Sequence, residues 1–144
     1  MDELIKTSKV AFASEYSFFL KAQFFHWNVE GANFPQYHEL FGNIYEEVYS
    51  NIDHFAENIR KLGSYTPGSF ERLSMLSRVD DETAIFDAAS MLTELLEDSD
   101  RMCKMFQVVF MLAEQNKEHG LADFYAGRLD AHRKHSWMLR STLK

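Results

Sequence analysis

Cysteine is almost absent from the 144-residue chain, which has only Cys103. A single cysteine forms no internal disulfide and no Cys-x-x-Cys pair, so a disulfide-rich secreted domain and a zinc finger are both excluded. A reducing compartment, the cytoplasm, is therefore expected. The chain also has no apolar run long enough to span a membrane, and its first ten residues mix acids with bases. We expect neither a signal peptide nor a membrane partner.

Basic residues are also in deficit, because 15 Lys and Arg face 22 Asp and Glu, a formal net charge of −7. Proteins bind nucleic-acid phosphates mainly through clustered Lys and Arg. Residues 1–15 carry two Lys against three acids, and residues 80–100 contain eight acids and no base. This balance predicts absent or weak DNA binding and favours cations as partners.

Proline and glycine are scarce as well, with two and six residues, and most lie in clusters at 31–35 and 63–68. Such clusters mark loops, and the segments between them are too long for strands. We expect a single all-α domain over 1–144, with helices at 4–30, 35–62, 81–118 and 121–143. A short extra helix is expected at 70–77, in the long connection between the second and third helices. Four long helices with one long crossover indicate a ferritin-like four-helix bundle.

The second expected helix has one apolar face, and candidate metal ligands lie beside it. His38, Asp53 and Glu57 border that face, and His26 precedes the helix among aromatic residues. Each of them alone is more readily a polar group on a helix flank. Imidazole and carboxylate side chains together, however, suit iron or zinc.

One chain cannot close such a site, because the segment from His38 to Asp53 covers about 22 Å of helix axis. A second copy packed antiparallel across a two-fold axis would bring the two ends together and create two equivalent sites. No Asp or Glu has a His three residues later, so the Glu-x-x-His motif of di-iron sites inside one bundle is missing. We therefore expect metal between subunits and not within one.

Three segments carry a family resemblance: HWNVEGANFPQYHELF at 26–41, NIDHFAENIRKLGSYTPGSF at 51–70 and ADFYAGRLDAHRKHSWMLRSTL at 122–143. Their HWN motif, the second His twelve residues later, the Asp-x3-Glu ahead of Leu-Gly and the closing WML resemble the Dps proteins, or mini-ferritins. The resemblance implies a homo-oligomer, a hollow dodecamer. It also implies ferroxidation at the subunit two-folds, typically with hydrogen peroxide, storage of ferric mineral and protection against oxidative stress.

By this resemblance, His26 and His38 of one subunit and Asp53 and Glu57 of its neighbour bind and oxidise iron, as Fe²⁺ and then Fe³⁺. Zinc is a substitute metal. Gly42 stands where the family has a further aspartate. A glycine provides no ligand, so the number of metals per site, one or two, stays open. We expect open space beside Gly42, and we expect Gly42→Asp to add a metal ligand rather than crowd the site.

Three further residues lie near the expected site. Glu46 either reaches a displaced metal or, as we favour, is an exposed or salt-bridged side chain. Trp27 is expected to pack over the site, and Tyr49 to pack or hydrogen-bond beside the ligands.

Glu118 and Asp123 bracket the turn into the last helix, which lines three-fold iron pores in the family; acids are equally natural at a helix N-terminus. The basic residues of the last helix are expected to form a solvated face favoured by the helix dipole. They are Arg128, His132, Arg133, Lys134, His135, Arg140 and Lys144.

Two functions from different classes follow. The first is a ferroxidase, an oxidoreductase acting on metal ions, combined with an iron-storage shell. Its activity is reduced if the loss of an aspartate at Gly42 weakens the site. The alternative is a structural or DNA-protecting particle whose ferroxidase site has degraded.

Overall fold

The computed structural model describes residues 1–144 and contains helices but no strand. The helices are α1 (Asp2–Asn28), α2 (Phe34–Tyr49), α3 (Ile52–Lys61), α4 (Phe70–Leu76), α5 (Ala88–Gln115) and α6 (His119–Leu143). The predicted all-α four-helix bundle is confirmed, and α4 is the short helix expected in the long connection. No helix combines the length and apolar character needed to cross a membrane.

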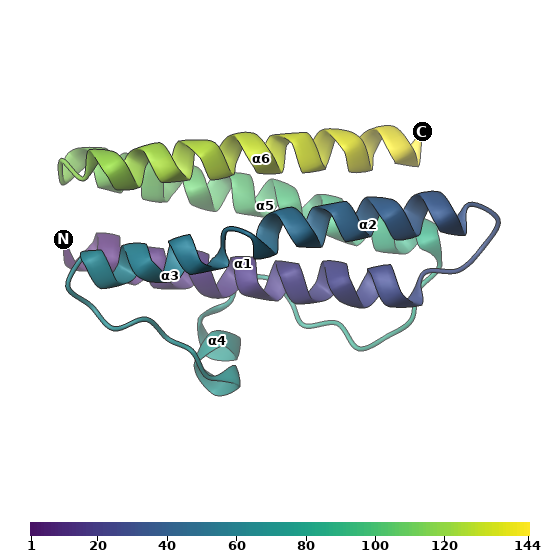
Figure 1. The fold of residues 1–144 in the computed structure, drawn as a ribbon, viewed down its shortest axis with the longest axis horizontal. Helices are drawn as coiled ribbons and strands as arrows, with labels where there is room; N and C mark the ends of the chain where they lie inside the picture. The colour runs from purple at the N-terminus through teal and green to yellow at the C-terminus, as the bar shows by residue number, and fades with distance from the viewer.

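The bundle consists of two antiparallel pairs (Figure 1). Helix α1 packs against α2 and α3, which follow one another along a single line, and α5 packs against α6. The segment between α3 and α5 runs the length of the bundle and carries α4 on the side of α1. Because of this crossover, α5 runs in the same direction as α2 and α3, as in the ferritin-like arrangement predicted from the sequence.

The second long helix is not continuous, which corrects the predicted helix over 35–62. It breaks at Ser50 and Asn51. The Ser50 hydroxyl and the Asn51 amide both donate to the Glu47 carbonyl, at 2.7 and 2.9 Å, while the Asn51 backbone N–H donates to Val48 at 3.0 Å. Side chains that compete for a backbone carbonyl in this way interrupt a helix. Residues before and after the break therefore cannot be placed around one continuous helix.

The third long helix begins later than predicted, at Ala88 rather than near residue 81. Asp87 is its N-cap, and the Asp87 carboxylate accepts a hydrogen bond from the Ser90 backbone N–H at 2.8 Å. The helix ends at Gln115, where Lys117 adopts a positive φ of 61° and the Glu118 N–H donates back to Ala113 at 2.9 Å. This is the geometry of a left-handed C-terminal cap, and it turns the chain directly into α6.

Candidate functional site

The candidate metal ligands His26 and His38 form a stacked pair where α1 ends and α2 begins. Their ring centroids lie 3.8 Å apart, with 16° between the planes. His26 Nδ1 lies 2.6 Å from the carbonyl oxygen of His38, and His38 Nδ1 lies 2.7 Å from the carbonyl oxygen of His26. The pair is thus tied together by two reciprocal contacts between ring and backbone.

These contacts fix the tautomer of both rings. A carbonyl oxygen only accepts, so each Nδ1 carries the hydrogen and donates it. In the neutral ring the Nε2 atom then carries the lone pair, and neither Nε2 has a hydrogen-bond partner in the chain. A backbone carbonyl that holds Nδ1–H is the usual support for an imidazole that binds metal through Nε2. Both histidines therefore have the orientation and the tautomer of a metal ligand, with the hydrogen on Nδ1 and a free lone pair on Nε2.

Gly42 lies against the ring of His26, which corrects the expected open space. Gly42 is buried, and a Cβ added to it would lie 3.0 Å from both Cε1 and Nδ1 of His26. The ring of His26 also lies edge-to-face with the ring of Tyr45, with 5.2 Å between centroids, and Phe34 lies against the ring of His38 at 5.0 Å. The ring of His26 fills the space that a side chain at position 42 would need.

Trp27 and Tyr49, expected beside the ligands, are mostly exposed, at 62% and 60%. The Tyr49 ring contacts Phe19 at 5.1 Å between centroids. Neither ring stacks on a histidine of the pair. Both instead add aromatic surface to the outside of the α1–α2 pair.

Two carboxylates of the predicted site, Asp53 and Glu57, lie beyond the helix break, whereas Glu46 lies before it. Asp53 and Glu57 are exposed on α3, and Glu46 is exposed on α2. None of the three forms an ion pair in the chain, and within one chain no three His, Cys, Asp or Glu residues gather as a metal site. Their meeting with His26 and His38 across a two-fold axis stays a prediction.

The predicted pore residues lie at the N-terminal end of α6. Glu118 is the N-cap of α6 and is half-buried, whereas Asp123 is exposed on the first turns of the helix. Both positions suit an acid at a helix N-terminus. Their role in a pore stays a prediction.

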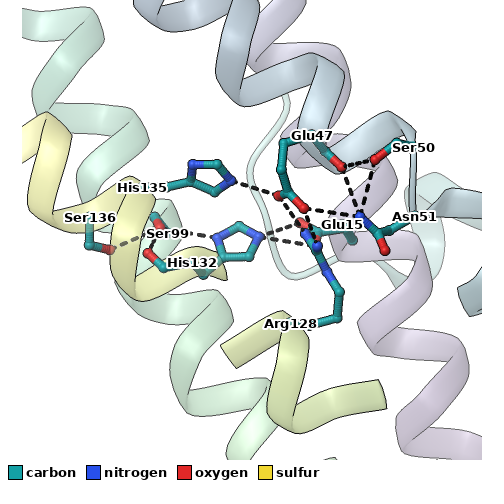
Figure 2. A network of polar contacts seen from close by, with 9 residues as sticks. All are labelled: Glu15, Glu47, Ser50, Asn51, Ser99, Arg128, His132, His135 and Ser136. Atoms are coloured by element: carbon teal, nitrogen blue, oxygen red, sulfur yellow. Dashed lines mark hydrogen bonds and ion pairs between the residues drawn. The ribbon is translucent and has the colours of Figure 1, made fainter. Parts of the chain in front are cut away.

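A buried polar network at the centre of the bundle was not predicted (Figure 2). Arg128 donates from Nη2 to Glu15 at 3.0 Å and to Glu47 at 3.1 Å. His132 Nε2 donates to Glu15 at 2.7 Å, and His135 Nε2 donates to Glu47 at 2.8 Å. The network joins α1, α2 and α6. The predicted solvated face is therefore wrong for Arg128, His132 and His135, which are buried.

Both carboxylates of this network favour the charged form. Burial works to raise the pKa of Glu15, but His132 and Arg128 outweigh it and hold that pKa below its ordinary value. Burial also opposes ionisation of Glu47, yet hydrogen bonds from His135 and Arg128 lower its pKa to about 2. Burial lowers the pKa of His132. Glu15 and Glu47 thus stay charged, and the guanidinium of Arg128 contacts both of them.

Serine hydroxyls complete the network on the side of α5. The Ser99 hydroxyl lies 3.1 Å from His132 Nδ1 and 3.1 Å from the His132 carbonyl, and it accepts from Ser136 at 2.9 Å. The spacing of Arg128, His132 and His135 places them on one face of a helix. This spacing in the sequence indicates that the three side chains share a face, but it does not identify their partners, which lie on other helices.

Two acids of the segment 80–100 form a second set of ion pairs inside the subunit. Asp98 is buried and accepts from Lys21 at 2.8 Å, and Glu94 accepts from the same ammonium at 3.1 Å. Burial raises the pKa of Asp98, with Lys21 opposing. Two of the eight acids thus hold α5 to α1, and the Lys21 ammonium offsets part of their charge.

Comparison with known proteins places this geometry in context. The family described as Ferritin-like domain matches residues 10–144. A DNA protection during starvation protein from Helicobacter pylori is 31% identical over 126 residues, covering 87% of this chain and 88% of that protein. A low temperature-induced protein from Nostoc sp. is 31% identical over 134 residues, covering 92% of this chain and 75% of that protein. The crystal structure of Dps from Staphylococcus aureus superposes with a TM-score of 0.95 at 26% identity, covering 100% of this chain and 97% of that one.

Proposed function

Because the chain belongs to the ferritin-like family, as one of its Dps proteins, we propose that it assembles into a hollow dodecameric shell that oxidises ferrous iron and stores the ferric product. Iron is here the substrate and the cargo. With hydrogen peroxide as oxidant, two ferrous ions each lose one electron, and the peroxide O–O bond breaks as it takes up both. Water supplies the remaining oxygen of two ferric oxyhydroxide units, and four protons are released. Consuming ferrous iron and peroxide together limits oxidative damage.

The observation that carries the proposal is the state of the histidine pair. His26 and His38 present two Nε2 lone pairs, each fixed by an Nδ1–H donated to a backbone carbonyl. Imidazole nitrogen binds ferrous iron, and carboxylate oxygen stabilises the ferric product. Asp53 and Glu57 are exposed and unpaired in the chain, so they are free to complete the site of a neighbouring subunit.

Exposed apolar residues on three helices support the assembly. Leu20 is 45% exposed and Trp27 is 62% exposed on α1, Tyr49 is 60% exposed on α2, and Phe70 is 88% exposed on α4. Large apolar side chains in such number usually mark a protein contact. A two-fold contact through this surface would bring α3 of one subunit towards the histidine pair of the other. The free thiol of Cys103 suits a cytoplasmic location.

A DNA-protecting role has its support in the names of relatives, such as the DNA protection during starvation protein of Bacillus anthracis, 27% identical over 125 residues. The charge of this chain opposes a direct DNA contact, since its net charge is −7. Protection by removal of iron and peroxide needs no such contact.

The test is stopped-flow oxidation of ferrous iron by peroxide in assembled shells. We expect oxidation well above the rate in buffer, and at least a tenfold loss in His38→Ala, because a metal ligand contributes more than the 10- to 100-fold typical of its supporting partners. His119→Ala is the matched control, since His119 is exposed and is the first residue of α6, which begins at the end of the bundle away from the turn between α1 and α2 (Figure 1). Oxidation no faster than in buffer would favour a structural or DNA-protecting particle instead.

A further inference from the structure

We propose that a groove between α5 and α6 binds a small inorganic oxyanion of the phosphate type. The groove has a volume of about 480 Å³. Six side chains line it: Asp100, Cys103, Lys104, Arg133, Ser136 and Arg140. Three of them are bases and one is an acid, although the chain as a whole has a net charge of −7. The groove shares no residue with the histidine pair, so the inference is independent of the proposed function.

The lining positions follow the helical repeat on both helices. Positions 133, 136 and 140 are three and four residues apart on α6, and positions 100, 103 and 104 are spaced in the same way on α5. Residues at such intervals share one face of a helix. The two faces meet along the groove, so its basic groups come from both helices and not from one exposed stripe.

Two of the three bases have no partner within the subunit. Arg140 lies 3.9 Å from Asp100, whereas Lys104 and Arg133 form no ion pair. Both of these side chains are exposed, one on α5 and one on α6. Lysine and arginine side chains donate hydrogen bonds and accept none. An anion between the two helices would thus receive charge-assisted hydrogen bonds from both, and these are the stronger kind.

The more buried residues of the groove add no negative charge. The buried Ser136 hydroxyl donates to Ser99 at 2.9 Å and belongs to the polar network of the bundle. Cys103 is half-buried, and burial raises the pKa of its thiol, with Asp100 adding to the shift. The thiol therefore stays uncharged at neutral pH and does not repel an anion.

The composition of the lining selects the class of anion. Ionised phosphate presents several acceptor oxygens, which suit the planar donor fork of arginine. No aromatic or large aliphatic side chain lines the groove, so nothing is available to hold the base of a nucleotide. Binding of duplex DNA depends on many phosphate contacts at once, which a single recess of this size does not provide.

The experiment uses Cys103, the only thiol of the chain, as a reporter in the intact protein. Alkylation by uncharged iodoacetamide is timed in inorganic phosphate and in chloride of equal ionic strength, so that charge screening is the same. Bound phosphate covers the thiol, and phosphate at about ten times its Kd should slow the reaction about tenfold. A crystal soaked in arsenate, a heavier analogue of phosphate, should show the anion between Lys104 and Arg133.

Three variants separate the groove from general charge. Lys104→Gln and Arg133→Gln each remove one unpaired base and should weaken phosphate binding by about tenfold or more. Lys134→Gln is the matched control, because it removes the same charge from the next position of α6, where Lys134 lines a cavity on the side of α2. The control should bind phosphate as wild type does. Each variant is compared with itself in chloride, so that a change in the basal reactivity of the thiol cancels.

Four results would overturn the inference. The first is equal alkylation in phosphate and chloride, and the second is equal protection in wild type, Lys104→Gln and Arg133→Gln. The third is tighter binding of adenosine monophosphate than of phosphate, which would contradict the choice of a free oxyanion. The fourth is a thiol that does not react in the intact protein, because a neighbouring subunit would then cover the groove.

Discussion

Arg128 Nη2 lies 3.0 Å from the carboxylate of Glu15, although 113 residues separate them in the chain. Both side chains are buried, so neither charge is compensated by solvent. The guanidinium also reaches Glu47 on α2 and thus occupies the centre of the bundle, where three helices meet. This pairing holds both carboxylates inside the subunit through one guanidinium.

The first prediction concerns stability. Arg128→Ala should lower the free energy of unfolding by about 3–5 kcal/mol, because removing one partner leaves a buried charge uncompensated. Chemical denaturation of the isolated variant measures this. Arg140→Ala is the control, since Arg140 and Asp100 form an exposed pair at 3.9 Å, and such pairs contribute about 0–1 kcal/mol. Equal losses in the two variants would contradict the role given to the buried pair.

Acid should weaken the bundle through Glu47. Its pKa in the folded chain is about 2, below the ordinary value of 4.5. A depressed pKa means that the contribution to stability is present above the unfolded value and is lost as pH falls from about 4.5 towards about 2. Denaturation of wild type and Glu47→Gln across this range provides the measurement. The variant should show the shallower pH dependence, and parallel curves would refute the assignment.

Assembly should depend on the exposed apolar surface of α1. Leu20→Asp places a charge where 45% of the side chain is exposed, so the subunit should still fold but the shell should dissociate. Analytical ultracentrifugation gives the mass, and circular dichroism confirms the helical content. Leu143→Asp, at the exposed C-terminal end of α6, serves as the comparison. A Leu20→Asp protein that remains fully assembled would place the two-fold contact elsewhere.

The assembled shell should not retard duplex DNA in a gel at about 0.15 M salt, where screening limits surface charge to a reach of about 8 Å. Six of the eight acids in residues 80–100 remain outside the buried pairs with Lys21, and an acidic surface repels phosphate. Retardation without added divalent cations would contradict this expectation.

The sequence predicted the helices and the histidine pair because both follow local rules. Clusters of proline and glycine separate the long helices, apolar periodicity marks the second of them, and His26 and His38 stand in a recognisable motif. The break at Ser50 and Asn51 escaped prediction, because side chains competing for one carbonyl leave the apolar period unchanged.

Contacts between residues far apart in the sequence were also not predicted. Glu15 and Arg128 meet only after α1 and α6 have packed, and the space at Gly42 is filled by a residue from another helix. Neither fact follows from residue type or spacing along one helix. The meeting of His26 and His38 with Asp53 and Glu57 depends in the same way on a second subunit, which no local rule can place.

The central claim, iron oxidation at a shared site, is tested most directly by a crystal of the assembled shell soaked anaerobically in ferrous iron and measured at the iron absorption edge. An anomalous peak should lie within bonding distance of Nε2 of His26 or His38 and of Asp53 or Glu57 from the neighbouring subunit. A shell with no peak there, or with its iron bound at Glu15 and His132 inside one bundle, would contradict the account.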